Sequence, residues 1–251
     1  MIPVPHSSKA SSVVRYSEAN VPTEHGTFRV VVYREDLGRA GFHDHVAVVK
    51  GDVRGDEVLV RVHSECMTGE VLHSMKCDCR EQLDFALQRV AAEGRGAVLY
   101  LRQEGRGIGL GDKIRAYALQ ERGVDTVDAN RMLGLPDDSR SYDVAAFMCA
   151  DLGIRSLALL TNNPLKVSHL RAEGVPVVRR VPVHIEPNEH NRGYLIAKTR
   201  RMGHHFDLAE LIRSPGVEIV QVETADGEPS STIEADDAVA DDTNVRSLRD
   251  R

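Results

Sequence analysis

The sequence predicts an α/β protein with a layered fold and a mixed β-sheet. Segments rich in β-branched residues alternate with segments of helical periodicity, and short joints containing Gly or Asn separate them. The first three predicted strands follow one another without a helix between them, so part of the sheet is expected to be antiparallel. The length of 251 residues, of which 41% are hydrophobic, is enough to bury a large core.

The individual elements follow from local patterns. Runs of β-branched and apolar residues predict strands at residues 27–33, 45–49, 57–62, 97–101, 156–160 and 175–181. Apolar residues at every third or fourth position predict helices at residues 81–92, 114–119, 143–152, 164–173 and 194–203. Segment 51–56 has the Gly and Asp content of a tight turn, which predicts a hairpin between the second and third strands.

The chain is expected to contain one globular domain, residues 24–215, between a flexible leader (1–23) and an acidic, disordered tail (216–251). From Glu223 onward there are nine acidic and three basic residues, which account for the whole net charge of −6. The neutral remainder argues against a nucleic-acid-binding protein, which needs a basic face. No apolar run is long enough to span a membrane, and the N-terminus lacks the apolar core of a signal peptide, so we expect a cytoplasmic protein.

Three of the four cysteines lie close together in the sequence and indicate a metal site. Cys66 is followed after ten residues by the segment Cys77-Asp78-Cys79. Thiolates suit Zn²⁺, and three protein ligands would leave the fourth tetrahedral position to water. His63 or His73 is an alternative fourth ligand, and reduced cysteines without a metal are the simpler alternative. The fourth cysteine is isolated in a predicted apolar helix.

Glu65 immediately precedes Cys66 in the segment His63-Ser64-Glu65-Cys66. This segment carries the H-x-E pattern in which zinc nucleobase deaminases use a glutamate as proton shuttle. The second half of the deaminase signature, P-C-x-x-C, is absent, so the likeness is partial. A solvated loop carboxylate is the alternative for Glu65.

Two segments that each follow a predicted strand and precede a predicted helix are candidate anion sites. The first, residues 102–110, combines glycines, which let the backbone approach a ligand, with Arg102 and Arg106, which can grip phosphate. Glu104 in this segment can accept hydrogen bonds from a donor edge such as that of guanine. The second, residues 161–166, offers a hydroxyl and a lysine. Ligands of open α/β sheets bind at such strand ends, although ordinary strand-to-helix turns are the alternative.

Five segments, taken in order, give a specific resemblance to a known family. They are residues 61–69 (RVHSECMTG), 77–79 (CDC), 102–106 (RQEGR), 113–117 (KIRAY) and 161–164 (TNNP). Together they resemble GTP cyclohydrolase II, the first enzyme of riboflavin biosynthesis, from about residue 24 to 206. The resemblance implies the fold of that family, a Zn²⁺ ion held by Cys66, Cys77 and Cys79, Mg²⁺ with the triphosphate, and a homodimer.

The resemblance also implies a reaction and the residues that perform it. GTP would lose diphosphate and formate and give 2,5-diamino-6-(5-phosphoribosylamino)pyrimidin-4(3H)-one. The implied contacts with GTP are Arg61, Val62, His63, Ser64, Glu65, Gln82, Glu104, Gly105, Arg106, Thr126, Thr161 and Lys166. Tyr117 would donate or relay a proton at the base, Asp138 would accept a proton, and Arg140 would attack the α-phosphorus. The alternatives are that Arg140 only stabilises charge and that Tyr117 is a core residue.

Two other functions remain open at this point. One is a cyclohydrolase that stops at the formamide, and the other is a binding protein that senses GTP around a structural zinc. Arg80, His73, Met67 and the pair Gly111-Asp112 depart from the family pattern, but none of them replaces a catalytic group. These departures also leave room for a specialised pathway instead of riboflavin synthesis.

Overall fold

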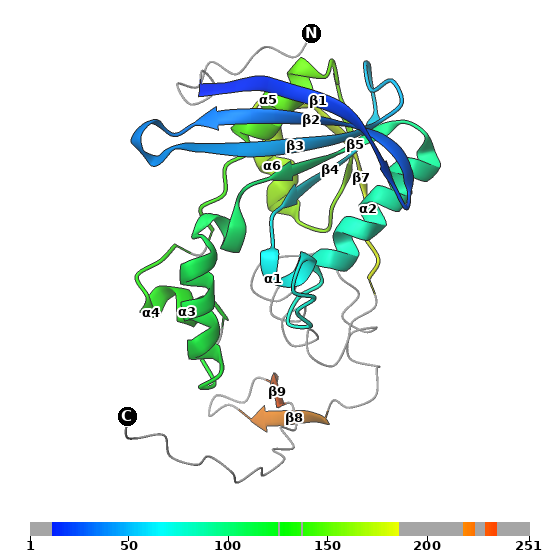
Figure 1. Ribbon diagram of the computed structural model, residues 1–251. Helices are drawn as coiled ribbons and strands as arrows, with labels where there is room; N and C mark the ends of the chain where they lie inside the picture. Colours follow the sequence, from blue (N-terminus) through cyan, green and yellow to red (C-terminus); the bar gives the residue numbers. More distant parts are fainter. Residues whose placement is uncertain (1–11, 125, 137, 186–217, 224–228, 235–251) are drawn as a thin grey trace. The chain divides into compact units, whose positions relative to one another are not determined.

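The structure is a computed structural model that describes residues 12–124, 126–136, 138–185, 218–223 and 229–234 (Figure 1). The chain divides into one unit of residues Met1–Phe206 and a second unit, Asp207–Arg251. The first unit contains a seven-stranded sheet with the strand order β1-β2-β3-β5-β4-β6-β7. The predicted α/β fold with a mixed sheet is confirmed.

The sheet has an antiparallel half and a parallel half. The antiparallel strands are β1 (Val13–Thr23), β2 (Gly26–Asp36), β3 (Phe42–Lys50) and β5 (Gly96–Leu101). The parallel half joins β5 to β4 (Val58–Ser64), β6 (Leu157–Leu160) and β7 (Val177–Val181). β4 and β6 are buried along nearly their whole length, as is typical of central strands that are covered on both faces.

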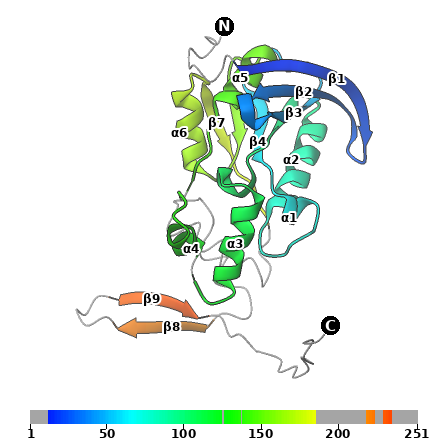
Figure 2. The ribbon, with the colours of Figure 1, turned by 60° about the vertical axis from the view of Figure 1, so that its left-hand side comes forward.

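Helices cover both faces of the sheet and create two cores. α5 (Asp143–Asp151) and α6 (Pro164–Ala172) lie on one face, and α2 (Cys79–Glu93) lies on the other (Figures 1 and 2). On β6, Leu159 belongs to the core shared with α5 and α6, whereas Leu160 belongs to the core shared with α2. The alternation of side chains across a strand explains why one strand supplies both cores.

The remaining helices of the first unit's described part lie mostly near strand ends. α1 (Met67–Glu70) follows β4, and the 3₁₀ turn η3 (Glu104–Gly107) follows β5. α3 (Leu110–Gln120) and α4 (Thr126–Met132) lie beside each other away from the sheet in Figures 1 and 2. A second 3₁₀ turn, η2 (Gly38–Ala40), connects β2 to β3. Neither α1 nor α4 was predicted from the sequence.

The prediction of a flexible leader is wrong for residues 13–23. These residues form β1, which pairs with β2 in antiparallel register from Val13 to Thr23. Every β1 residue after Val13 is exposed, so the strand has no buried face and no alternation of apolar and polar positions. Residues 1–11 lie outside the described residues.

The predicted hairpin through residues 51–56 is also wrong. β5 lies between β3 and β4, antiparallel to β3 and parallel to β4. Because β4 is buried on both faces, it occupies a central position with parallel neighbours instead of returning beside β3.

The predicted disordered tail contains a strand pair. β8 (Glu218–Glu223) and β9 (Pro229–Glu234) form a two-stranded antiparallel sheet in the second unit, so the prediction is wrong for these segments. The other residues of 216–251, and the predicted helix at 194–203, lie outside the described residues. Within the described part of the chain, no helix is both long and apolar enough to cross a bilayer.

Candidate active site

Most of the predicted site residues gather at one edge of the sheet. β4, β5 and β6 are neighbours and run parallel, so the segments that follow them leave the sheet at the same edge. Cys66 follows β4, the Gly-rich segment follows β5, and Thr161 follows β6. The expectation that both candidate anion segments lie at carboxyl ends of strands is confirmed.

Cys66, Cys77 and Cys79 bring their sulfur atoms together. The three Sγ atoms lie within 4.8 Å of one another, and those of Cys66 and Cys77 are 3.7 Å apart. Two sulfurs bound to one tetrahedral zinc ion at about 2.3 Å are about 3.8 Å apart. Gly69 makes room for the cluster, because a Cβ there would lie 2.8 Å from Cys77 Sγ and 3.3 Å from Cys66 Sγ. The sulfur set therefore fits a zinc ion.

Contacts among the three thiols oppose their simultaneous ionisation. Hydrogen bonds with Cys77 and Cys79 lower the pKa of Cys66. The hydrogen bond with Cys66 raises the pKa of Cys77 to about 11, and contacts with both neighbours raise the pKa of Cys79. The thiols by themselves thus favour one thiolate, and deprotonation of all three requires the positive charge that a divalent ion brings.

Neither histidine considered as a fourth ligand belongs to this cluster. His63 Nε2 hydrogen-bonds to Glu70 Oε1 at 2.7 Å, and Arg80 Nη1 donates to His73 Nδ1 at 3.0 Å. Among the described residues, the group of potential ligands here contains the three cysteines alone. Three ligands leave a coordination position for water or substrate, which is typical of catalytic zinc sites. His73 and Arg80, both unusual in the sequence, prove to be partners.

Glu70, which was not predicted, connects several groups beside the sulfur cluster. Its carboxylate accepts hydrogen bonds from the backbone N of Cys66 at 3.1 Å and from the Tyr100 hydroxyl at 2.5 Å, and it bonds to His63. Burial raises the pKa of Glu70 to about 7. His63 is buried and stacks on Tyr100 with ring centroids 5.7 Å apart. The sequence signal for Glu70 was its position one helical turn after Cys66.

Glu65 is anchored at the end of β4 and is not a fully solvated loop residue. Its Oε2 lies 2.8 Å from Arg102 Nε, and the carboxylate side chain is 20% exposed. Burial raises the pKa of Glu65, although the charge of Arg102 acts in the opposite direction. The ion pair with Arg102 therefore fixes the position of the Glu65 carboxylate at the edge of the site.

The Gly-rich segment has an unusual backbone and is tied to the metal-binding segment. Gly105 and Arg106 both adopt left-handed conformations, with φ of 61° and 62°, which is strained for Arg106 and is a feature of functional loops. Glu104 Oε1 accepts from the N of Gly105 at 2.8 Å and from Lys113 Nζ at 2.9 Å, while Oε2 accepts from the N of Met67 at 2.6 Å. The carboxylate that was predicted to bind guanine is thus already engaged within the protein.

The segment that carries Asp138 and Arg140 packs against the Gly-rich segment. The backbone N of Ser139 donates to the carbonyl oxygen of Arg106 at 3.0 Å. A Cβ on Gly107 would lie 3.1 Å from Ser139, so the close approach requires glycine. Asp138 and Arg140 form an ion pair at this position. The structure therefore brings two of the predicted catalytic residues beside a predicted phosphate-binding loop.

Two predicted contacts of GTP are buried cations. Arg61 donates to the carbonyl oxygen of Leu160 at 3.1 Å and to Gln82 Oε1 at 2.5 Å, and Lys166 donates to the carbonyl oxygen of Val62 at 2.7 Å. Burial lowers the pKa of Arg61, and its Nε has no hydrogen-bond partner among the described residues. Arg61 on β4 and Lys166 on α6 thus bring buried positive charge to the backbone of β4 and β6.

Three further predicted residues occupy the ends of elements. Thr161 is buried after β6, and its Oγ1 accepts a hydrogen bond from the N of Asn163, the residue that caps α6. Ser64 ends β4, and its Oγ is buried without a hydrogen-bond partner among the described residues. Thr126 begins α4, but its side chain lies outside the described part of the structure.

Tyr117 lies on α3 and is linked to the sulfur cluster through a lysine. The Nζ of Lys113 lies 5.7 Å from the Tyr117 ring centroid and 3.1 Å from Cys66 Sγ. Lys76 Nζ lies 5.1 Å from the same ring. Tyr117 is half-buried, so the alternative that it is a core tyrosine does not match its position.

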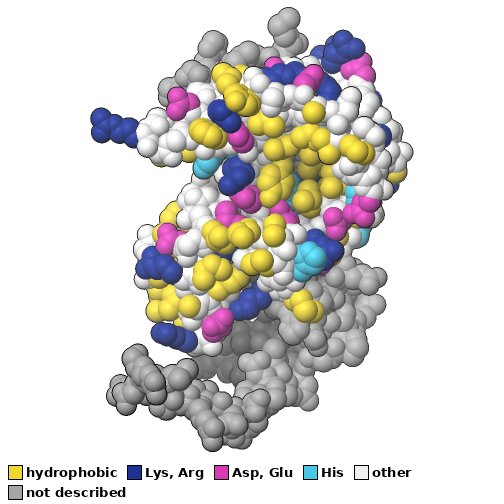
Figure 3. Space-filling view, in the orientation of Figure 1, with side chains coloured by type: hydrophobic (Ala, Val, Ile, Leu, Met, Phe, Trp, Pro, Cys, Tyr) yellow, Lys and Arg dark blue, Asp and Glu magenta, His cyan; other side chains and the backbone are white. Residues whose placement is uncertain are grey.

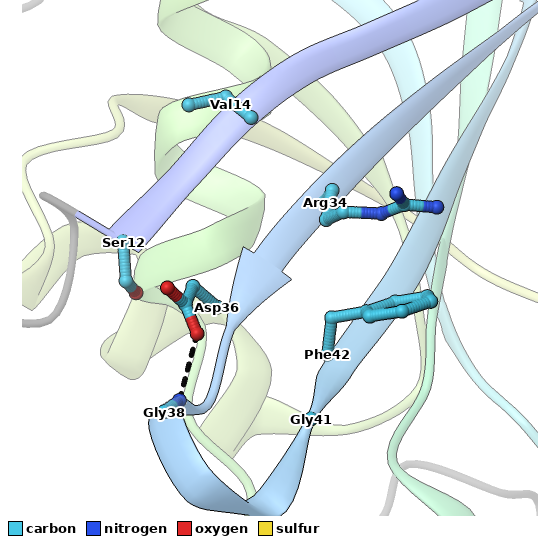
Figure 4. Close-up of a pocket in the computed structure, with 7 residues that line it drawn as sticks. All are labelled: Ser12, Val14, Arg34, Asp36, Gly38, Gly41 and Phe42. Atoms are coloured by element: carbon cyan, nitrogen blue, oxygen red, sulfur yellow. Dashed lines mark hydrogen bonds between the residues drawn. The ribbon is translucent and has the colours of Figure 1, made fainter.

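A surface pocket of about 600 Å³ lies elsewhere, beside the turn between β2 and β3 (Figure 4). Its lining residues are Ser12, Val14, Arg34, Asp36, Gly38, Gly41 and Phe42. The Arg34 guanidinium is paired with Asp44 at 2.8 Å and lies 4.0 Å from the ring centroid of Phe42. Since none of the predicted site residues lines this pocket, it is not the candidate active site.

Glu35, His43 and His45 form a second group of potential metal ligands. The backbone N of Arg102 donates to His45 Nδ1 at 3.2 Å, so in the neutral ring the proton is on Nε2, which faces Glu35 Oε2 at 3.1 Å. A protonated nitrogen offers no lone pair to a metal. This group therefore does not fit a metal site. Its hydrogen bonds attach the residue that follows β5 to β3 and β2.

Comparison with known proteins identifies relatives over most of the first unit. The sequence profile of a family described as GTP cyclohydrolase II matches residues 14–182. The GTP cyclohydrolase-2 of Actinobacillus succinogenes is 47% identical over 197 residues, which cover 78% of this chain and 89% of that protein.

Larger proteins match the same part of the chain. The riboflavin biosynthesis protein RibBA of Salinispora arenicola is 53% identical over 201 residues, covering 79% of this chain and 47% of its own. The RibBA of Phocaeicola vulgatus is 49% identical over 200 residues, covering 78% of this chain and 49% of its own. The chain thus spans about half the length of these RibBA relatives.

Proposed function

Because the chain belongs to the GTP cyclohydrolase II family, we propose that it catalyses the first step of riboflavin biosynthesis. GTP would lose diphosphate and formate, and the imidazole ring of its guanine would be opened. The observation that carries the proposal is the convergence of three thiols, a strained Gly-rich loop and the Asp138–Arg140 pair at one edge of the sheet.

The proposed metal is Zn²⁺ held by Cys66, Cys77 and Cys79, with Mg²⁺ accompanying the triphosphate. When bound, zinc would supply an activated water molecule and polarise the formyl oxygen. Three thiolates donate more charge than three histidines and leave a weaker Lewis acid, so neighbouring side chains must assist the proton transfers.

At the phosphate end, Arg106 and the Gly-rich loop would hold the triphosphate beside Arg140. A guanidinium has a pKa above about 12 and no available lone pair, so attack on phosphorus by Arg140 needs a base in contact with it. Asp138, which binds the Arg140 guanidinium, is that base in the covalent version of the mechanism. In the other version Arg140 stabilises the departing diphosphate without forming a bond.

At the base end, Tyr117 would donate or relay a proton near C8 of guanine. Glu65, held by Arg102, and the backbone of the β4 end would position the purine. The buried positive charges of Arg61 and Lys166 would favour the binding of a polyanionic substrate. The remaining proposed contacts with GTP are Val62, His63, Ser64, Gln82, Glu104, Gly105, Thr126 and Thr161.

We also propose a homodimer. On the face shown in Figure 3, hydrophobic side chains gather over the sheet and over α3. Among the exposed large hydrophobic residues are Val71, Leu72 and Met75 between the metal-binding segments, and Ile114 on α3. Exposed apolar side chains that gather on one face are typical of interaction surfaces.

The test is incubation of the zinc-loaded protein with GTP and Mg²⁺, with formate and diphosphate measured separately and the product identified by mass spectrometry. We expect equal amounts of both and the diaminopyrimidine product. Diphosphate without formate would instead show an enzyme that stops at the formamide. Bound GTP with neither product would show a binding protein.

Cys77→Ser tests the role of the metal, and Cys149→Ala is its matched control. This variant should lose zinc and formate release while it remains folded, because the two cores lie elsewhere. Cys149→Ala removes a thiol from α5 within the core and should keep its zinc. Full formate release by Cys77→Ser would refute the role of the metal.

A further inference from the structure

Lys113 uses its ammonium group to join the sulfur cluster to the Gly-rich segment. Its Nζ donates to Cys66 Sγ at 3.1 Å, to Thr68 Oγ1 at 2.8 Å and to Glu104 Oε1 at 2.9 Å. Three acceptors match the three protons of an ammonium group. The side chain is only 12% exposed, so this arrangement is held within the protein and not on its surface.

The contacts form a closed circuit that includes a proposed metal ligand. Glu104 Oε2 accepts from the N of Met67, the residue after Cys66, at 2.6 Å. The Nζ of Lys113 donates to both Glu104 Oε1 and Cys66 Sγ, which closes the circuit. Lys113 lies in the first turn of α3, the helix that follows the Gly-rich segment, and its backbone N donates to the carbonyl oxygen of Gly109, the N-cap of that helix, at 3.1 Å. A displacement of Lys113 would therefore affect both the sulfur and the carboxylate.

The charges of these groups explain why a lysine occupies this position. Three thiolates around one divalent ion leave a net negative charge, and Glu104 adds another a short distance away. Buried like charges are unfavourable unless a cation is placed between them. Lys113 lies within hydrogen-bonding distance of both negative groups and can offset their repulsion.

We propose that Lys113 is a positioning residue that holds Glu104 and the Cys66 thiolate together, so that metal binding and the Gly-rich loop are coupled. This inference rests on the proposed function only for the identity of the metal as zinc. Lys113 orders the groups that would surround the substrate, and its own side chain transfers no proton and forms no covalent bond.

The test measures zinc affinity of the full chain by competition with a chromophoric chelator. Lys113→Met keeps the length of the side chain but removes its charge and donors, and it should weaken zinc binding about 10- to 100-fold. Lys113→Arg keeps the charge and should recover most of the affinity. Lys50→Met is the matched control, because Lys50 Nζ donates to the carbonyl oxygen of Thr27 and contacts no sulfur.

A second variant tests the coupling itself. If Lys113 offsets repulsion between the thiolates and Glu104, adding Glu104→Gln to Lys113→Met should restore part of the lost zinc affinity. A merely structural role for the lysine would not produce this recovery. The absorption bands of the Co²⁺-substituted protein should shift in Lys113→Met and return toward the wild-type spectrum in the double variant.

The outcomes separate this inference from the proposed function. Wild-type zinc affinity and an unchanged Co²⁺ spectrum in Lys113→Met would overturn the inference, whatever the GTP assay shows. An equal loss of affinity with and without Glu104→Gln would overturn the coupling. Should Lys113→Met fail to fold, Lys113→Arg and Glu104→Gln alone carry the test. A wild-type protein that binds zinc but releases neither product would contradict only the proposed function.

Discussion

The Arg140 guanidinium forms a bidentate ion pair with Asp138, in which Nε donates to Oδ1 at 2.9 Å and Nη2 donates to Oδ2 at 2.5 Å. The backbone N of Arg140 also donates to Oδ1 at 3.0 Å. Burial acts to raise the pKa of Asp138, but the hydrogen bonds and charge of Arg140 outweigh it, and the pKa lies below its ordinary value. Asp138 is therefore ionised at neutral pH, as a proton acceptor must be.

The same geometry occurs at the surface and provides a control. Arg54 donates through Nε and Nη2 to both oxygens of Asp52, two residues before it, at 2.9 and 2.7 Å. Both side chains of that pair are well exposed, and neither belongs to the predicted site. The ion pair alone thus does not indicate catalysis, and its location beside the Gly-rich loop is what distinguishes Asp138 and Arg140.

Asp138→Asn should slow diphosphate release by about 10²- to 10⁴-fold, the usual contribution of a general base. The amide keeps the shape of the side chain but cannot accept the proton. Asp52→Asn makes the same change at the surface pair and should leave the rate unchanged. Single-turnover diphosphate release measures both variants, and equal rates in the two would remove Asp138 from the mechanism.

Tyr117→Phe and Arg140→Ala should fail in different ways. Tyr117→Phe loses a proton donor at the base end, so it should release diphosphate faster than formate. Arg140→Ala loses the group at the α-phosphate and should release neither product if the phosphate step comes first. Separate assays of diphosphate and formate distinguish them. Equal loss of both products in both variants would contradict the assignment of two chemical ends.

Gly69→Ala should abolish zinc binding without unfolding the protein. The added Cβ would lie 2.8 Å from Cys77 Sγ, which a compact sulfur cluster cannot accommodate. Gly111→Ala is the matched control, because a Cβ on this α3 residue meets no atom within 4 Å. It should keep its zinc and gain up to about 1 kcal/mol in free energy of unfolding from better helix propensity. Metal content and melting temperature test both variants.

Cys149 should be unreactive toward thiol reagents in the folded protein. It is fully buried in the core, and burial raises its pKa to about 12. The thiolate, which is the form that reacts, is therefore strongly disfavoured at pH 8. Peptide mapping after labelling of the metal-free protein should find the cluster cysteines modified and Cys149 modified only after denaturation. Labelling of Cys149 at the rate of Cys66 would refute its burial.

Local patterns in the sequence were enough to predict most helices and the central strands. β5 is a continuous apolar run because it is buried on both faces, and α2 shows helical periodicity because it buries one face against the core. β1 was missed because ten of its eleven residues are exposed, so its backbone pairing with β2 leaves no pattern of apolar residues. The spacing of Cys66, Cys77 and Cys79 likewise predicted a group that the structure brings together.

Which residues meet at the site depends on the packing of distant segments in the fold. Glu70 lies one helical turn after Cys66, but Tyr100 on β5 and Lys113 beyond it come close to Cys66 and Glu70 only because β5 is inserted between β3 and β4. Strand order is set by competition among distant segments for the same sheet edge, a free-energy balance that no local pattern records. Local sequence patterns therefore identify the chemical groups of the site, and the fold sets which of these groups contact one another.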